Sequence, residues 1–215
     1  RGAKDVTVRF EDTGFETTVA MYSLQKGEVK DRLKPSFYGV GVVGEAFVKN
    51  DPMYNTWMCM LNRCYGAMHT KKNSPYKDCS VSENFKYYPY FKEWCNNQIG
   101  FNSVDEKGKP FALDKDILVK GNRVYNEDVC VFVPSEINNV LTKRGNKRGD
   151  CVVGVRKYKD KFIATVSTGK RVQDHLGIFK TEKDAFQAYK EAKEVYTKEV
   201  ANKWKDQIDL RVYEA

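Results

Sequence analysis

Three short strand-like runs followed by one long amphipathic stretch restrict the folds open to the C-terminal part of the chain. The runs are CVVGVRKY (151–158), KFIATVS (161–167) and KRVQDHLGIF (170–179), with turn residues between them. The stretch 181–204 predicts a helix, because Thr181 can cap it and apolar side chains recur at helical spacing. Three strands with one helix across them are sufficient for a small α+β domain.

Strand alternation divides the side chains of this predicted sheet between two faces. Phe162, Ala164 and Val166 are expected to point toward the helix. The positions expected to point the other way are Arg156, Tyr158, Ile163, Thr165, Ser167, Arg171, Gln173 and His175. A sheet can enter the major groove of DNA, where Arg contacts guanine and Gln contacts adenine. The face opposite the helix is therefore a candidate DNA-binding surface, with an ordinary surface His as the alternative reading of His175.

The same region resembles the Apetala-type (ethylene-response) DNA-binding domain, which also occurs in phage and bacterial HNH endonucleases. The matching residues are Gly154 to Arg156, Phe162 to Val166, Leu176, Gly177, Phe179, and Thr181 to Tyr189. The resemblance implies docking on duplex DNA through the sheet. Ile163 and Thr165 replace more polar residues of the plant pattern, so the base preference is expected to be different or weak.

A second distinctive stretch, residues 111–139, predicts a strand, a loop, a second strand and the start of a helix. LDKDIL (113–118) alternates apolar and charged residues, and VCVFV (129–133) is rich in β-branched and aromatic residues. KGN (120–122) indicates a turn, and Pro134 with Ser135 marks the start of a short helix. The expected layout is a hairpin followed by a helix.

This stretch resembles the HNH motif of phage homing endonucleases, which are ββα-metal nucleases. The residues that carry the resemblance are Gly121, Asn122, Arg123, Asn126, the VCVFV strand and Asn138. The family places its general-base His where this chain has Lys115 or Asp116, so the motif is degenerate. The candidate catalytic residues that the resemblance implies are Asp114, Lys115, Asp116, Asn122 and Asn138.

The missing His has a chemical consequence. An imidazole takes a proton from water near neutral pH, whereas Asp116 would need a raised pKa and Lys115 a lowered one. A carboxylate can still hold a hard divalent cation. If the protein cuts DNA, we expect Mg²⁺ or Mn²⁺ on Asp116, helped by Asn138 or Asp114, with Asn122 orienting the loop or the attacking water. If it does not, no cofactor is expected and the hairpin serves DNA docking or packing.

The rest of the chain predicts three further segments and a linker. Residues 1–37 are expected to form a small β module with a hairpin at 6–20. VRFEDTGFETTV followed by LQKGEVKD resembles a module of phage homing endonucleases, and the alternative is a simple two-stranded cap on the next domain. Residues 38–142 form the HNH-like domain, with helices at 51–65 and 83–101. The first is expected to bury Tyr54, Trp57, Met58, Leu61 and Cys64, and the second Tyr88, Phe91, Cys95 and Ile99. Residues 143–150 form a basic linker before the domain 151–215.

Charge and composition favour a nucleic-acid partner. The formal charge is +8 and the pI about 9.0, and a surplus of Lys and Arg suits a polyanion. The linker adds Lys143, Arg144, Lys147 and Arg148, which either follow a phosphate backbone or are simply solvated. Six Cys without a CxxC pair and only two His argue against a structural zinc site.

The sequence contains no apolar run of membrane length, so we expect no membrane partner and a cytoplasmic location, in the bacterial host if the protein is phage-encoded. The expected function is that of a duplex DNA-binding protein resembling phage HNH homing endonucleases, with metal-dependent cleavage open. The alternatives are a non-catalytic regulator or site-occluding factor, and an RNA-binding or protein-interaction module. The sequence indicates neither the target site nor the oligomeric state.

Overall fold

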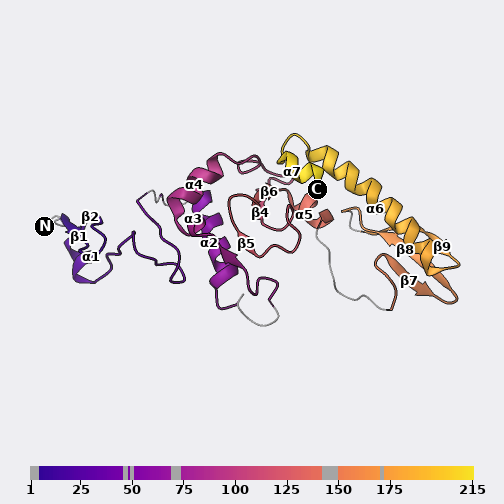
Figure 1. The fold of residues 1–215 in the computed structure, drawn as a ribbon, viewed down its shortest axis with the longest axis horizontal. Coiled ribbons are helices and arrows are strands. Elements are labelled where there is room, and N and C mark those ends of the chain that lie inside the picture. The colour runs from indigo at the N-terminus through magenta and orange to yellow at the C-terminus, as the bar shows by residue number, and fades with distance from the viewer. Residues whose placement is uncertain (1–4, 46–47, 49–50, 69–73, 142–149, 170–171) are drawn as a thin grey trace. The chain divides into compact units, whose positions relative to one another are not determined.

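The fold, a computed structural model, describes residues 5–45, 48, 51–68, 74–141, 150–169 and 172–215 (Figure 1). The chain forms two compact units. Unit 1 comprises Arg1–Gln98 and Val119–Cys130, and unit 2 comprises Ile99–Leu118 and Val131–Ala215. Both units contain helices and strands, so the predicted α+β class is confirmed. The proposed domain limits at 37, 142 and 150 stay predictions.

Unit 1 begins with the predicted hairpin. Strand β1 (Asp5–Arg9) pairs antiparallel with β2 (Glu16–Ala20), and helix α1 (Met21–Gln25) follows directly. Gly14 lies in the turn with a φ of 72°, a conformation that glycine adopts without a Cβ penalty.

Helix α2 (Pro52–Tyr65) begins and ends where its capping residues predict. The Asp51 carboxylate accepts a hydrogen bond from the Met53 N–H at 2.9 Å, and Gly66 is the C-cap. The side chains that α2 buries are Trp57, Met60, Leu61 and Cys64. The expectations for Tyr54 and Met58 were therefore wrong, since both are half-buried: Met60 takes a buried position, because 57, 60, 61 and 64 follow one face of a helix.

The second predicted helix of this region is divided into α3 (Glu83–Lys86) and α4 (Tyr88–Asn96), separated by Tyr87 in an extended conformation. Pro89 lies in the first turn of α4, where a missing N–H breaks no helical hydrogen bond. Ile99 is exposed and not buried as expected, because α4 ends at Asn96. The core around these helices is aromatic and includes Trp57, Phe85, Tyr88, Phe91 and Trp94.

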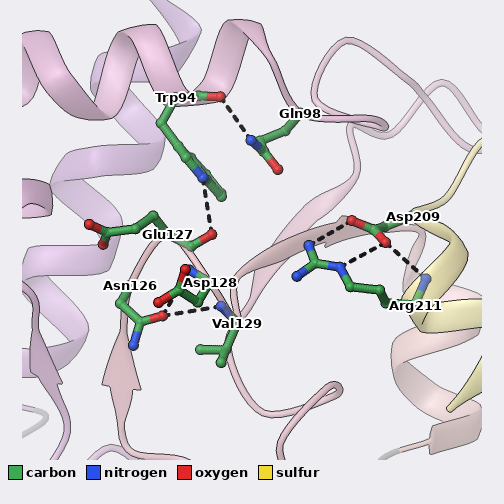
Figure 2. Close-up of polar contacts among 8 residues, drawn as sticks. All are labelled: Trp94, Gln98, Asn126, Glu127, Asp128, Val129, Asp209 and Arg211. Carbon is green, nitrogen blue, oxygen red and sulfur yellow. Dashed lines mark hydrogen bonds and ion pairs between the residues drawn. The ribbon is translucent and has the colours of Figure 1, made fainter.

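Strand β3 (Ser80–Val81) pairs in parallel with β5 (Val124–Tyr125), a pairing that local sequence patterns do not reveal. Figure 2 shows the turn that follows β5: the Asn126 side chain accepts hydrogen bonds from the N–H groups of Asp128 and Val129, both at 3.1 Å. The Trp94 indole N–H donates to the Glu127 carbonyl at 3.3 Å. These bonds hold Val129 in a turn, so the second strand of the predicted hairpin is shorter than expected.

We define the ββα segment as residues 111–141; residues 111–118 and 131–141 belong to unit 2, and the residues between them, with β5, belong to unit 1. Strand β4 (Ala112–Asp114) pairs antiparallel with β6 (Val131–Val133), and helix α5 (Ser135–Leu141) follows. The first strand ends at Asp114 and not at 118 as expected. The Asp114 carboxylate accepts the N–H groups of Asp116 and Ile117, at 2.9 and 3.0 Å, which turns the chain away from the ladder.

The C-terminal part of unit 2 has the predicted three-stranded sheet and helix. Strands β7 (Val155–Tyr158), β8 (Lys161–Val166) and β9 (Asp174–Phe179) form an antiparallel sheet in that order. Helix α6 (Glu182–Trp204) covers one face, with the Thr181 hydroxyl accepting from the Asp184 N–H at 3.1 Å. The short helix α7 (Leu210–Glu214) closes the chain, and its Asp209 cap also binds the Arg211 side chain (Figure 2).

The far end of α6 packs against the ββα segment. Trp204 is buried, and its ring meets the Phe111 ring edge-on with centroids 5.5 Å apart. Its indole N–H donates to the Glu136 carboxylate of α5 at 2.9 Å, and the Lys203 ammonium donates to the same oxygen at 2.7 Å. One helix thus contacts both the sheet and α5.

None of the described helices combines the length and the apolar character needed to cross a lipid bilayer.

Candidate nucleic-acid interface

The sheet face opposite α6, which we call the outward face, gathers most of the described residues predicted to contact DNA. Arg156 and Tyr158 come from β7, and Thr165 comes from β8. His175 lies at the start of β9, and Gln173 directly precedes that strand. Arg156, Thr165, Gln173 and His175 line one open hollow together with Val172. All of them except the half-buried Thr165 are exposed.

Strand register explains this grouping. Arg156 pairs with Ile163, which pairs with Ile178, and Thr165 pairs with His175. Side chains of directly paired residues project from the same side of a sheet. The register therefore places Arg156 and His175 on a common face, as alternation alone predicts.

A β-bulge in β9 changes which side chains face outward in the residues that follow it. The register shifts between Ala164 and Thr165, which leaves Leu176 as an extra residue, and Gly177 has a φ of 141°. Leu176 and Phe179 consequently both join the core beneath α6. Ile178, between them, projects to the outward face and is 52% exposed. Strict alternation from His175 would have placed Ile178 beneath the helix, so this residue was missed.

Ile163 faces outward as expected, yet only 5% of its surface is exposed. It lies on the central strand, and its direct partners Arg156 and Ile178 stand on either side of it. The middle of the outward face is therefore apolar beneath a polar and basic surface.

One hydrogen bond orients a predicted base-contacting side chain. The Thr165 hydroxyl donates to Oε1 of Gln173 at 3.1 Å. The bond fixes the direction of the Gln173 amide, which carries both donors and a further acceptor lone pair for a ligand. Tyr158, at the other end of the face, is about half exposed and has the Lys159 ammonium 5.8 Å from its ring centroid.

Five predicted DNA-contacting residues lie outside the described residues: Lys143, Arg144, Lys147, Arg148 and Arg171. Their role stays a prediction.

The second candidate site is the turn that ends β4. Lys115 is buried, with 7% of its surface exposed, and its ammonium lies 3.5 Å from the Asp116 carboxylate, whose side chain is about half exposed. Burial raises the pKa of Asp114, and the neighbouring Asp116 carboxylate raises it further, while backbone N–H groups oppose the shift. The carboxyl group whose protonation is favoured is thus Asp114, and Lys115 supplies a positive charge beside Asp116.

Sequence alternation contained a signal for the burial of Lys115. In LDKDIL, Leu113, Lys115 and Ile117 fall on one side and Asp114 and Asp116 on the other. A Lys on the apolar side is expected to be buried beside a counter-charge, because an unpaired buried ammonium is costly.

The two predicted Asn residues occupy different units. Asn122, in unit 1, holds its own loop: its amide donates to the Val124 carbonyl at 2.7 Å and accepts the Val124 N–H at 3.2 Å. Asn138, in unit 2, lies in α5 and is half-buried. Among the described residues, no group of three or more His, Cys, Asp or Glu side chains is arranged to hold a metal ion. A Mg²⁺ or Mn²⁺ site at Asp116 and Asn138 stays a prediction.

Comparison with family models, with curated proteins and with solved structures finds no match to this chain. The function is therefore inferred from the residues and geometry alone.

Proposed function

We propose that this protein binds duplex DNA through the outward face of the β7–β8–β9 sheet. The observation that carries the proposal is the common hollow lined by Arg156, Thr165, Gln173 and His175. These side chains offer hydrogen-bond donors and acceptors on an open surface, in a chain with a formal charge of +8. Such a surface suits the base edges and phosphates of a groove better than an enclosed small molecule.

The major groove admits an α-helix or a β-ribbon, and it is the groove in which Arg and Gln distinguish bases. The Arg156 guanidinium can contact the O6 and N7 atoms of guanine, and the Gln173 amide can contact the N6 and N7 atoms of adenine. Lys161 pairs with Tyr158 at the end of the same face and is placed to meet a phosphate. Specificity then comes from the middle of the face and affinity from its basic edge.

Fluorescence anisotropy with a labelled mixed-sequence duplex tests the proposal. Arg156→Ala is expected to weaken binding about tenfold, because a bidentate Arg contact contributes roughly 1–3 kcal/mol. The matched control is Lys190→Ala, which removes one positive charge from α6 on the opposite side of the sheet. If both variants bind like the parent chain, or if heparin competes as well as duplex DNA, the outward face is not a DNA-binding surface.

Metal-dependent cleavage of the bound DNA is a second proposal, and the pair of carboxylates at the end of β4 favours it. Asp114 and Asp116 lie close enough for each to affect the other, and oxygen ligands of this kind suit Mg²⁺ or Mn²⁺. A bound ion would polarise the scissile phosphate and stabilise the leaving oxygen. The Lys115 ammonium already compensates part of the charge of Asp116, so this carboxylate attracts a metal ion less strongly than an unpaired one would.

Incubation of supercoiled plasmid with the protein and Mg²⁺ or Mn²⁺ separates an endonuclease from a non-catalytic DNA-binding regulator. Cleavage that is lost in Asp116→Ala and retained in Asp206→Ala, an exposed Asp elsewhere in unit 2, supports the enzyme. Salt-sensitive binding without cleavage in any variant supports the regulator or site-occluding factor.

A further inference from the structure

Two exposed apolar side chains interrupt the polar outward face. Val172 is 74% exposed and lies two residues before the edge strand β9, and Ile178 is 52% exposed and lies within it. Val172 lines the hollow that also contains Arg156, Gln173 and His175. Ile178 pairs directly with the buried Ile163, so the two side chains are neighbours on the outward face.

The major groove offers only one apolar group to such side chains. Each base pair presents hydrogen-bond donors and acceptors there, and thymine alone among the four bases adds a methyl group at C5. An Ile or Val facing the groove therefore gains from an A·T pair and gains little from an unmodified G·C pair.

We propose that Ile178 and Val172 make the outward face prefer A·T-containing sites by contacting thymine methyl groups. This inference rests on the proposed binding of duplex DNA. The Gln173 amide, oriented by Thr165, supplies a matching preference for adenine on the opposite strand. Arg156 adds a guanine contact, so the preferred site combines A·T pairs with at least one G·C pair.

The geometry of the strand holds Ile178 in place for this contact. The bulge at Leu176 and Gly177 sends Ile178 outward, while Phe179 remains in the core beneath α6. Ile163 supports the Ile178 side chain from the central strand and is itself 5% exposed. The apolar contact is therefore pre-organised, and binding loses little side-chain entropy.

Four labelled duplexes of equal length test the inference by adding or removing the methyl group alone. A mixed-sequence duplex rich in A·T pairs is compared with the same duplex carrying dU for dT, which lacks the methyl, and a mixed-sequence duplex rich in G·C pairs is compared with the same duplex carrying 5-methyl-dC for dC, which gains one at the same position. For the parent chain, loss of the methyl is expected to weaken binding roughly fourfold for each methyl contacted, and the added methyl to strengthen binding by a similar factor.

The variant Ile178→Ala is expected to reduce the difference between the dT and dU duplexes, and its combination with Val172→Ala is expected to abolish that difference. Val195→Ala is the matched control, because it shortens an exposed apolar side chain on α6. Thermal unfolding of each variant, measured in parallel, shows whether the sheet is intact. A variant that unfolds early is replaced by Ile178→Thr, which keeps the β-branched shape and removes part of the apolar surface.

Three results overturn the inference and differ in what they leave standing. Failure of all four duplexes to bind removes the proposed function itself. Equal binding of dT and dU duplexes by the parent chain leaves DNA binding intact and refutes the methyl contact. A methyl effect that persists undiminished in the double variant assigns it to DNA shape and not to Ile178 and Val172.

Discussion

The contact between α6 and α5 makes a prediction that depends on one carboxylate. Glu136 accepts hydrogen bonds from the Trp204 indole N–H and the Lys203 ammonium, at 2.9 and 2.7 Å. Replacing Glu136 removes the acceptor of both hydrogen bonds that join the end of α6 to α5. We expect Glu136→Ala to lower the free energy of unfolding more than Glu136→Gln, since Gln retains one acceptor oxygen.

The magnitude follows from the burial of each partner. Trp204 is buried, and a buried donor left without an acceptor costs about 1–3 kcal/mol. Lys203 is partly exposed, so its ion pair contributes about 0–1 kcal/mol. Glu136→Ala should therefore destabilise the protein by about 2 kcal/mol and Glu136→Gln by about 1 kcal/mol. Glu106→Gln, at the other, well-exposed partner of Lys203, should cost less than about 0.5 kcal/mol.

The pH dependence gives a second signature. Burial alone would raise the pKa of Glu136, but hydrogen bonds from Lys203 and Trp204 outweigh it and lower the pKa. A lowered folded-state pKa means that ionised Glu136 stabilises the protein above its unfolded pKa, about 4.3, and that this contribution is lost as the pH falls through the folded value. The stabilities of the parent chain and of Glu136→Gln, measured by urea unfolding, should therefore converge once the pH has fallen below the lowered folded-state pKa of Glu136. A stability difference that stays constant from neutral to acidic pH refutes the reasoning, as does a Glu106→Gln effect as large as that of Glu136→Gln.

Two further substitutions test other parts of unit 2. Gly154→Ala places a Cβ 2.1 Å from the Tyr189 ring at a φ of +80°, so urea unfolding should show a loss of about 2–4 kcal/mol, part of which Tyr189→Ala restores. Asp114→Asn removes a carboxyl whose pKa is raised by burial and by Asp116. Because a raised carboxyl pKa makes stability fall as pH rises, the variant should exceed the parent chain in stability at neutral pH and match it in acid; a smaller stability at neutral pH contradicts this.

Local sequence rules predicted the bounds of those helices that have a capping residue at an end. Asp51 and Gly66 define α2, and Thr181 defines the start of α6, because capping side chains satisfy the free N–H groups of a helix end. Alternation predicted the three strands of the C-terminal sheet but not all of their ends, since β7 begins at Val155 and not at Cys151, and β9 begins at Asp174 and not at 170. The parallel pairing of β3 with β5 was not predicted, since it joins segments more than forty residues apart through two residues each.

The ββα segment shows why the predicted strands were longer than the observed ones. Alternation in LDKDIL describes a strand of full length, but the Asp114 side chain captures the N–H groups that a longer strand would use. Asn126 does the same before the second strand. Short polar side chains that bond to the nearby backbone compete with the sheet ladder, and this competition is invisible to a pattern of apolar residues.

The candidate DNA-binding surface was predictable up to the bulge. Arg156, Thr165, Gln173 and His175 follow from period-two alternation, and they line one hollow. A bulge inserts one residue and reverses the assignment beyond it. Gly177 marked the place, since glycine within a strand often indicates a bulge. Only the pairing register establishes that the faces exchange there.

At position 178, core packing decides the direction of the side chain but not its apolar character. Leu176 and Phe179 both reach the core beneath α6, and the bulge at Leu176 makes this possible by turning position 178 to the outward face. Core packing thus decides the direction of the side chain at 178, yet any strand-forming residue, including Thr, would satisfy it. An Ile that is half exposed beside Arg and Gln side chains gains nothing from water. Its apolar character acquires a role once a methyl group in the groove of DNA covers it, and the comparison of thymine with uracil measures that role directly.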